Sequence, residues 1–220
     1  MTSNVKADVL QVFSTDIQQI DWSNSGLNQD LKNKLWKKRA LDPEGVYRSN
    51  RSGTWHSKDD VLTTTGKAGE ELGEMFHASF LKYAGTFATK PGQLTLKLAA
   101  WAMMYSHGGY ATVHTHPNCH FSGVYYVDTS PEVQEKTMAT GVQIQPGSIE
   151  FVDTRGTGSF QVPGLNLQPA ARVVPKDGRM LAFPSWLPHF VHPVEGEGVR
   201  IAIACNATVL SFQQQEEVNA

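Results

Sequence analysis

Residues 94–128 read LTLKLAAWAMMYSHGGYATVHTHPNCHFSGVYYVD. Apolar and polar residues alternate through 94–106, the period of a half-buried strand, and a Gly-Gly turn separates this run from two further strand-like runs at 110–116 and 122–128. Short runs of the same kind follow with no helical pattern between them, at 148–153, 172–174, 180–183, 190–194 and 199–206. Consecutive short strands that no helix separates are typical of an antiparallel barrel or a double-sheet jelly roll.

The first 90 residues have a different character. Three leucines recur every four residues within 27–41, which predicts one apolar helix face, and a second helix is predicted over 70–85. A short strand is expected at 9–14. The predicted fold class is therefore α+β and mainly β. We expect a single domain spanning the whole chain, with a helical support region at 1–90 packed on a core at 91–212.

Composition excludes several classes of protein. The chain has 220 residues, 19 basic against 21 acidic, and a formal net charge of −2, which does not suit a dedicated nucleic-acid binder. Two cysteines are too few for a disulfide scaffold, and no apolar run approaches the roughly 20 residues of a membrane span. Nothing at the N-terminus has the pattern of a signal peptide. We therefore expect a cytoplasmic protein without nucleic-acid or membrane partners.

Two histidines near the middle of the chain have the spacing of metal ligands. His114 and His116 lie two residues apart on a predicted strand, so their imidazoles point to the same face. Imidazole binds Fe, Zn, Cu or Ni, and such a site needs at least one more donor from elsewhere in the chain. His189 and His192, in a proline-flanked stretch at 183–194, are both candidates for the third ligand.

An arginine on the last predicted strand points to a bound anion. Arg200 follows His189 by eleven residues, past a Glu-Gly-Glu-Gly turn, and a hairpin of that length would return Arg200 alongside His189 inside the barrel. A buried guanidinium needs an anionic partner, and its planar donors match a carboxylate. The partner is either a carboxylate cosubstrate or an internal salt bridge with Glu150 or Asp153.

Seven short stretches between about residues 48 and 206 form a set of motifs that is informative through its order and spacing. They are Arg48-Ser49-Asn50, Gly53-Thr54-Trp55-His56-Ser57, His114-Thr115-His116-Pro117-Asn118, Ser122-Gly123-Val124-Tyr125-Tyr126-Val127, Phe151-Val152-Asp153-Thr154-Arg155, Phe183-Pro184-Ser185-Trp186-Leu187-Pro188-His189, and Val191-His192-Pro193-Val194 leading to Arg200. In this order and spacing the set resembles the 2-oxoglutarate- and Fe(II)-dependent oxygenases, in particular a prolyl-hydroxylase-like family of bacteria and phages.

The resemblance implies a double-stranded β-helix that uses Fe(II), 2-oxoglutarate and O2. It assigns His114 and the distal His189 as metal ligands, and Arg200 with Tyr126 as the residues that bind the far carboxylate of 2-oxoglutarate. It implies hydroxylation of a C–H bond in an amino-acid-like, peptidyl or small-metabolite substrate, with release of succinate and CO2.

The sequence departs from the family at one ligand position. His116 stands where the family has Asp or Glu, which makes the site one charge more positive and shifts its preference toward Zn, Ni or Cu. We predict His114, His116 and His189 as the ligands. The alternatives are a carboxylate ligand from Asp153, or Asn118 in a shifted motif.

Five further residues are candidates for substrate contacts or for hydrogen bonds to the ligands: Trp101, Asn118, His120, Asp153 and Trp186. A homodimer is an option that the sequence neither requires nor excludes. The alternative function is a cupin-like metal-binding protein, or a three-histidine metalloenzyme that does not use 2-oxoglutarate. Neither alternative needs a ligand at Arg200 or Tyr126.

Overall fold

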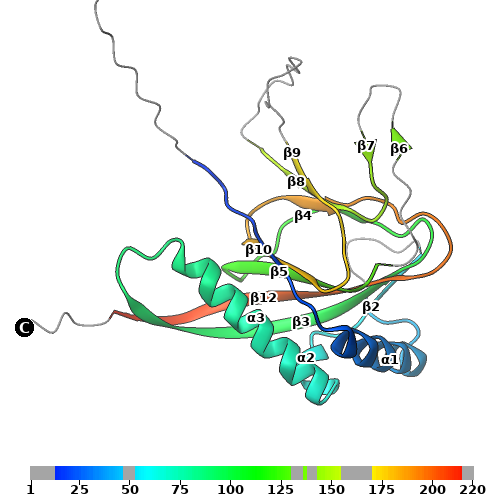
Figure 1. Cartoon of the computed structure of the whole chain (residues 1–220), viewed down its shortest axis with the longest axis horizontal. Coiled ribbons are helices and arrows are strands. Elements are labelled where there is room, and N and C mark those ends of the chain that lie inside the picture. The colour runs from blue at the N-terminus through cyan, green and yellow to red at the C-terminus, as the bar shows by residue number, and fades with distance from the viewer. Residues whose placement is uncertain (1–12, 47–52, 130–135, 138–142, 155–169, 215–220) are drawn as a thin grey trace, which may run out of the picture.

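The computed structural model describes residues 13–46, 53–129, 136–137, 143–154 and 170–214. Its strands form two facing antiparallel sheets (Figure 1). The larger sheet has the order β1 (Gln18–Asp21), β10 (Arg179–Pro184), β5 (Phe121–Asp128), β12 (Arg200–Gln214), β3 (Gly92–Tyr105), β2 (Thr54–His56). The smaller has the order β4 (Ala111–His114), β11 (His189–Val191), β8 (Ile149–Val152), β9 (Ala170–Val173), and a separate ribbon pairs β6 (Lys136–Thr137) with β7 (Gln143–Ile144). The predicted mainly β double-sheet jelly roll is confirmed.

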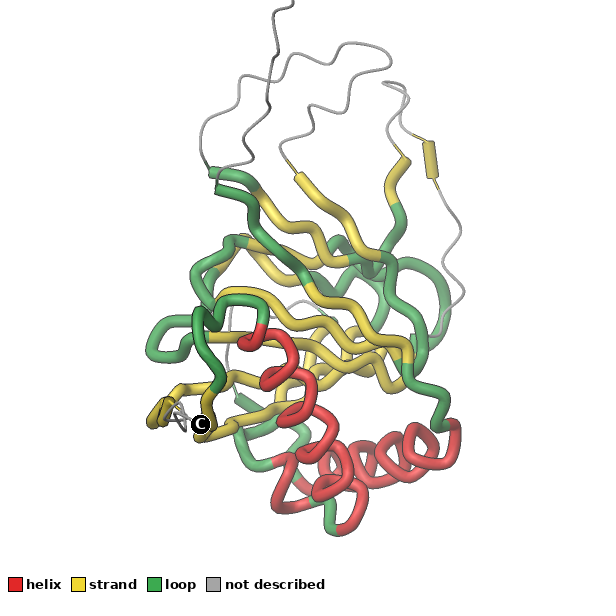
Figure 2. The backbone as a smooth tube through the Cα atoms, turned by 60° about the vertical axis from the view of Figure 1, so that its left-hand side comes forward, coloured by secondary structure: helices red, strands yellow, loops and turns green. Residues whose placement is uncertain are grey.

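The helices cover the outer face of the six-stranded sheet (Figure 2). They are α1 (Ser25–Leu41), α2 (Val61–Thr64) and α3 (Lys67–Gly85). The predicted leucine face of α1 is fully buried, and the helix begins where the side chain of Asn24 accepts a hydrogen bond from the N–H of Leu27. Helix α3 buries the apolar stripe that its sequence predicts, including Phe76 and Phe80. None of the helices in the described residues is long and apolar enough to cross a membrane.

Alternation along the central strands directs one set of side chains toward the helices and the other toward the second sheet. On β3, Ala100, Ala102 and Met104 belong to the core shared with the helices. The intervening Trp101 and Tyr105 line the space between the sheets. This space is closed on one side by the helix-backed sheet and on the other by β4, β11 and β8.

Three expectations about the strands need correction or completion. Residues 9–12 of the expected strand at 9–14 lie outside the described residues, and the first described strand is the short, polar β1. Strands β1 and β2 both join the six-stranded sheet, so residues 1–90 supply more than helical support. The hairpin expected between His189 and Arg200 is wrong, because β11 pairs with β4 and β8 while β12 pairs with β3 and β5.

Candidate metal centre

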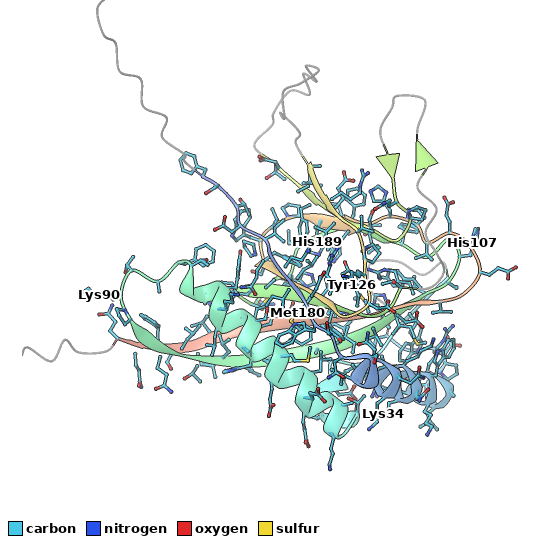
Figure 3. All side chains as sticks on the ribbon, in the orientation of Figure 1. Lys34, Lys90, His107, Tyr126, Met180 and His189 are labelled. Carbon is cyan, nitrogen blue, oxygen red and sulfur yellow. The ribbon has the colours of Figure 1, made fainter. Side chains whose placement is uncertain are left out.

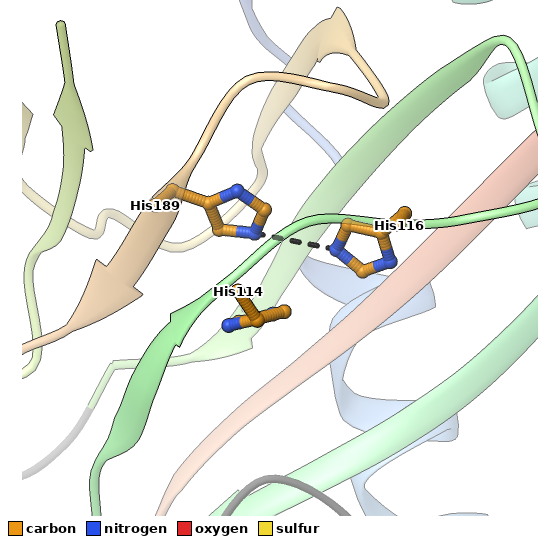
Figure 4. Close-up of side chains that lie close together, drawn as sticks. All are labelled: His114, His116 and His189. Atoms are coloured by element: carbon orange, nitrogen blue, oxygen red, sulfur yellow. Dashed lines mark hydrogen bonds between the residues drawn. The ribbon is translucent and has the colours of Figure 1, made fainter. Parts of the chain in front are cut away.

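Three imidazoles converge at one point between the sheets (Figure 4). His114 ends β4 and lies directly opposite His189, the first residue of β11, in the strand register. His116 follows His114 by two residues and reaches the same point from the loop. One nitrogen of each ring lies within 4.8 Å of the others, and this is the one group of three potential ligands found in the described part of the chain.

Backbone hydrogen bonds orient two of the three rings. Nδ1 of His114 donates to the carbonyl of Thr112 at 2.7 Å, and Nδ1 of His189 donates to the carbonyl of Leu187 at 2.9 Å. Because a carbonyl only accepts, the proton of each neutral ring lies on Nδ1, and Nε2 keeps its lone pair. This is the arrangement by which proteins orient metal-bound histidines.

The donor set fits a divalent transition metal. Nε2 of His116 and Nε2 of His189 lie 3.2 Å apart. Two nitrogens bound to one metal at about 2.0–2.1 Å, with an angle near 90–110°, are separated by about 2.9–3.4 Å. Burial lowers the pKa of His114, and burial together with the nearby His114 lowers the pKa of His189 to about 4. Both rings are therefore neutral at pH 7, the state that binds metal.

The histidines share a cavity of about 430 Å³ with Arg200 and Tyr126. Figure 3 shows His189 and Tyr126 between the two layers of strands. Arg200, the first residue of β12, is 2 % exposed, and Tyr126 of β5 is fully buried. The guanidinium carbon lies 5.0 Å from the centre of the Tyr126 ring. Metal-binding donors and a deeply buried cation therefore occupy one enclosed space.

The cationic side of the cavity has unsatisfied polar atoms. Nε and Nη1 of Arg200 and the hydroxyl of Tyr126 have no hydrogen-bond partner among the described residues. Burial raises the pKa of the Tyr126 phenol, and this outweighs the opposite effect of the Arg200 cation, so the hydroxyl is a donor. Orphaned buried donors around a cation are costly unless an anion binds them, and a carboxylate has the matching geometry.

The salt bridge considered for Arg200 is absent from the described residues. Glu150 points to the outer side of the smaller sheet, where its Oε2 accepts from Arg172 at 2.5 Å and contacts Nε2 of His192 at 2.8 Å. No ion pair joins Arg200 to Asp153 in the part of the chain that the structure describes. His192 is thereby removed as an alternative to His189, because its ring faces Glu150 and not the cluster.

Comparison with known proteins finds one matching family. A family model described as "Putative 2OG-Fe(II) oxygenase" matches residues 99–206, which include all three histidines, Tyr126 and Arg200. Over this stretch the chain is similar to the 2OG-Fe(II) oxygenases. Fe(II) and 2-oxoglutarate are the cofactor and cosubstrate of this family. No curated protein matches the chain by sequence.

Solved structures share the fold of this chain at low identity. A Pseudomonas putida prolyl-4-hydroxylase superposes with a TM-score of 0.60 at 14 % identity, over 92 % of this chain and 94 % of that chain. A Trichoplax adhaerens prolyl hydroxylase, in complex with a peptide fragment of the hypoxia-inducible factor, gives 0.61 at 12 % identity over 87 % and 83 %. HygX from Streptomyces hygroscopicus, with nickel and 2-oxoglutarate bound, gives 0.54 at 14 % identity over 94 % and 87 %.

The five residues considered for substrate contacts or hydrogen bonds to the ligands fall in different places in the structure. Trp101 lines the cavity, and its ring centre lies 5.7 Å from that of His116. Trp186 and Asp153 line a separate hollow beside Phe13, so Asp153 is no alternative ligand.

The other two candidates lie on the loop after His116. Asn118 is exposed, has a positive φ of 65°, and is not part of the histidine cluster, so the shifted ligand motif is not supported. His120 is also exposed, and its Nδ1 accepts a hydrogen bond from the N–H of Val209. His120 thus anchors the loop to β12 instead of bonding to a ligand ring.

The structure adds cavity residues to which sequence reasoning gave no role. His56, Tyr105 and Asn206 line the same space, with the carboxylate-bearing Asp59. Tyr105 continues the alternation of Trp101 along β3, so that spacing could have revealed it. His56 belongs to one of the matching motifs, which gave it no chemical role, and it lies on a three-residue strand whose place in the sheet depends on distant pairing. Residues 48–50 and Arg155 of the matching motifs lie outside the described residues.

Proposed function

We propose that this chain hydroxylates a C–H bond of an amino-acid-like, peptidyl or small-metabolite substrate, using Fe(II) bound by His114, His116 and His189. The observation that carries the proposal is the shared cavity, in which three convergent neutral imidazoles face the same space as an unpaired, buried arginine. A metal-binding protein without a carboxylate cosubstrate would have no use for the orphaned donors of Arg200 and Tyr126.

Different residues bind the metal and the cosubstrate. The three imidazoles hold the metal, and the backbone carbonyls of Thr112 and Leu187 keep two of them in the binding tautomer. Arg200 binds the far carboxylate of 2-oxoglutarate through its free N–H groups, and the hydroxyl of Tyr126 donates a further hydrogen bond. When bound, Fe(II) and 2-oxoglutarate supply O2 activation, with release of succinate and CO2 and transfer of one oxygen atom to the substrate.

The neutral donor set distinguishes this site from one with a carboxylate ligand. Three imidazoles bring no negative charge, so the bound cation keeps its full charge toward other ligands. A doubly charged 2-oxoglutarate is therefore attracted both by the metal and by Arg200. The same neutrality favours nickel, copper or zinc over harder cations when metals compete.

The substrate class is supported by the cavity and by two fold relatives. The Trichoplax enzyme binds a peptide, and one HygX structure contains hygromycin B. Beyond the metal ligands, Trp101, Ala204 and Asn206 line the cavity and are available for substrate contacts.

The test is turnover of 2-oxoglutarate by the purified protein with Fe(II) under air. We expect succinate to form, and we expect a mass gain of one oxygen atom in the true substrate when peptide and metabolite libraries are added. The alternative, a three-histidine or cupin-like metal protein that does not use 2-oxoglutarate, is favoured only by the neutral donor set. Metal binding without succinate formation, with or without the libraries, would support that alternative.

A further inference from the structure

The guanidinium of Arg200 lies against two aromatic rings, and no salt bridge to it is found among the described residues. Its central carbon lies 5.7 Å from the centre of the Tyr105 ring and 5.0 Å from that of Tyr126. Nε and Nη1 have no hydrogen-bond partner among the described residues. The position of the cation before an anion binds is therefore set by these two ring faces and by packing.

Tyr105 is in turn fixed by a histidine outside the metal cluster. The rings of His56 and Tyr105 are stacked, with centres 5.6 Å apart and planes inclined by 16°. Nε2 of His56 lies 3.2 Å from the hydroxyl of Tyr105, and both side chains are almost completely buried. A stacked and hydrogen-bonded ring of this kind has little rotational freedom.

The three residues lie on three neighbouring strands of one sheet. Tyr105 ends β3, and its register partner on β12 is Arg200. On its other side Tyr105 pairs with Thr54 of β2, the edge strand that carries His56. A line of contacts thus runs from the sheet edge through Tyr105 to the cation, and all three side chains line the cavity.

We propose that His56 is a positioning residue for the cosubstrate: it fixes Tyr105, and Tyr105 holds Arg200 in the orientation that receives the far carboxylate of 2-oxoglutarate. This inference rests on the proposed function. It gives β2 a role in cosubstrate selectivity, because an ordered cation favours a ligand whose second carboxylate reaches it. A ligand that binds only the metal gains nothing from that order.

The test compares two 2-oxo acids by anaerobic titration of the Fe(II)-loaded protein, followed by the metal-to-ligand absorption band. 2-Oxoglutarate has the far carboxylate, and 2-oxobutyrate lacks it. In His56→Leu we expect 2-oxoglutarate to bind about three- to thirty-fold more weakly, the range of one cation–π contact, with 2-oxobutyrate unchanged. His56→Gln, whose amide can replace Nε2 as a hydrogen-bonding group, should recover most of the loss.

The outcomes separate positioning from a structural role. Equal weakening of both acids, with a lowered melting temperature, would show that His56 only stabilises the sheet edge and would overturn the inference. Unchanged binding of 2-oxoglutarate in His56→Leu would overturn it as well, even if Arg200→Met weakens binding and so supports the proposed function. A wild-type protein that binds Fe(II) but not 2-oxoglutarate would contradict the proposed function and the inference together.

Discussion

The two sheets that enclose the cavity contribute different chemistry and hold it in different ways. The six-stranded sheet is covered by helices on its outer face, and it carries Tyr126 inside β5 and Arg200 at the start of the long strand β12. The four-stranded sheet carries His114 and His189 at strand ends, where backbone carbonyls orient the rings. It also bears a polar group formed by Arg172, Glu150 and His192, none of which lines the cavity.

This difference indicates that metal binding and cosubstrate binding are separable. The metal ligands depend on a few hydrogen bonds near strand ends, and the anion site depends on ring packing across three strands. A substitution in one sheet should therefore change the affinity for either Fe(II) or 2-oxoglutarate and leave the other affinity unchanged.

The largest effect is expected from His189→Ala. Loss of one of three ligands should lower the affinity for Fe(II) by at least about a hundredfold, more than the loss of a supporting hydrogen bond. Anaerobic Fe(II) titration measures this affinity. His192→Ala is the matched control, since His192 lies three residues away on the same segment but faces Glu150. Comparable losses in both variants would place the metal elsewhere.

The metal-free protein should lose stability in mild acid because the four-stranded sheet buries His189 in its neutral form. Burial, with the charge of His114, lowers the pKa of His189 from 6.5 to about 4. Between pH 4 and pH 6.5, His189 is therefore protonated in the unfolded chain but neutral in the folded chain. The free energy of unfolding of the metal-free protein should fall by about 3 kcal/mol as the pH drops from 6.5 to 4. The lowered pKa of His114 acts in the same direction.

Chemical denaturation across this pH range, with the metal removed by a chelator, measures the slope. His189→Gln removes the titrating group, so its unfolding free energy should depend less steeply on pH. An identical slope in the wild-type protein and the variant would mean that His189 does not titrate as its burial requires.

In the six-stranded sheet, Arg200→Met should weaken 2-oxoglutarate binding about ten- to a hundredfold, the range of one charged hydrogen bond. Fe(II) affinity should be unchanged. The free energy of unfolding of the ligand-free protein should not fall, because the variant removes a buried cation for which the described residues supply no ion pair. Arg179→Met is the control on the same sheet, since Arg179 pairs with Asp21. If Arg179→Met weakens 2-oxoglutarate binding as much as Arg200→Met, the effect does not come from the cavity.

The smallest effect is expected from Arg172→Ala on the outer side of the four-stranded sheet. Its ion pair with Glu150 is partly exposed, and its loss should cost at most about 1 kcal/mol of unfolding free energy. Neither Fe(II) nor 2-oxoglutarate affinity should change. Calorimetric melting with parallel ligand titrations checks both statements, and a ligand effect would show that the two sides of this sheet are coupled.

Much of this architecture could be predicted because its signals are local. The leucine spacing of α1 and the alternation of β3 each reflect burial of one face, and both elements form where the periodicity predicts them. The two-residue spacing of His114 and His116 likewise follows from strand geometry. Pairing between distant segments gives no such signal. From the sequence we therefore predicted that a hairpin places Arg200 beside His189. That hairpin does not form, but both residues line the cavity between the sheets.

The same limit explains the residues that had been left without a role. Strand β2 has three residues, and its position beside β3 depends on contacts across about fifty residues of chain. The contact of His56 with Tyr105 exists only in the folded sheet. The exposed Trp186 shows the opposite effect: its neighbours in sequence pointed to the cavity, but its side chain lines another hollow.

The central claim is that three neutral histidines and one unpaired arginine form a single site for Fe(II) and 2-oxoglutarate. Its most direct test is anaerobic titration of the Fe(II)-loaded wild-type protein with 2-oxoglutarate, followed by visible absorption. The account predicts a charge-transfer band that saturates at one 2-oxoglutarate per chain, is absent from His189→Ala, and needs higher concentrations in Arg200→Met. Bound iron with no such band at any concentration of 2-oxoglutarate would contradict it.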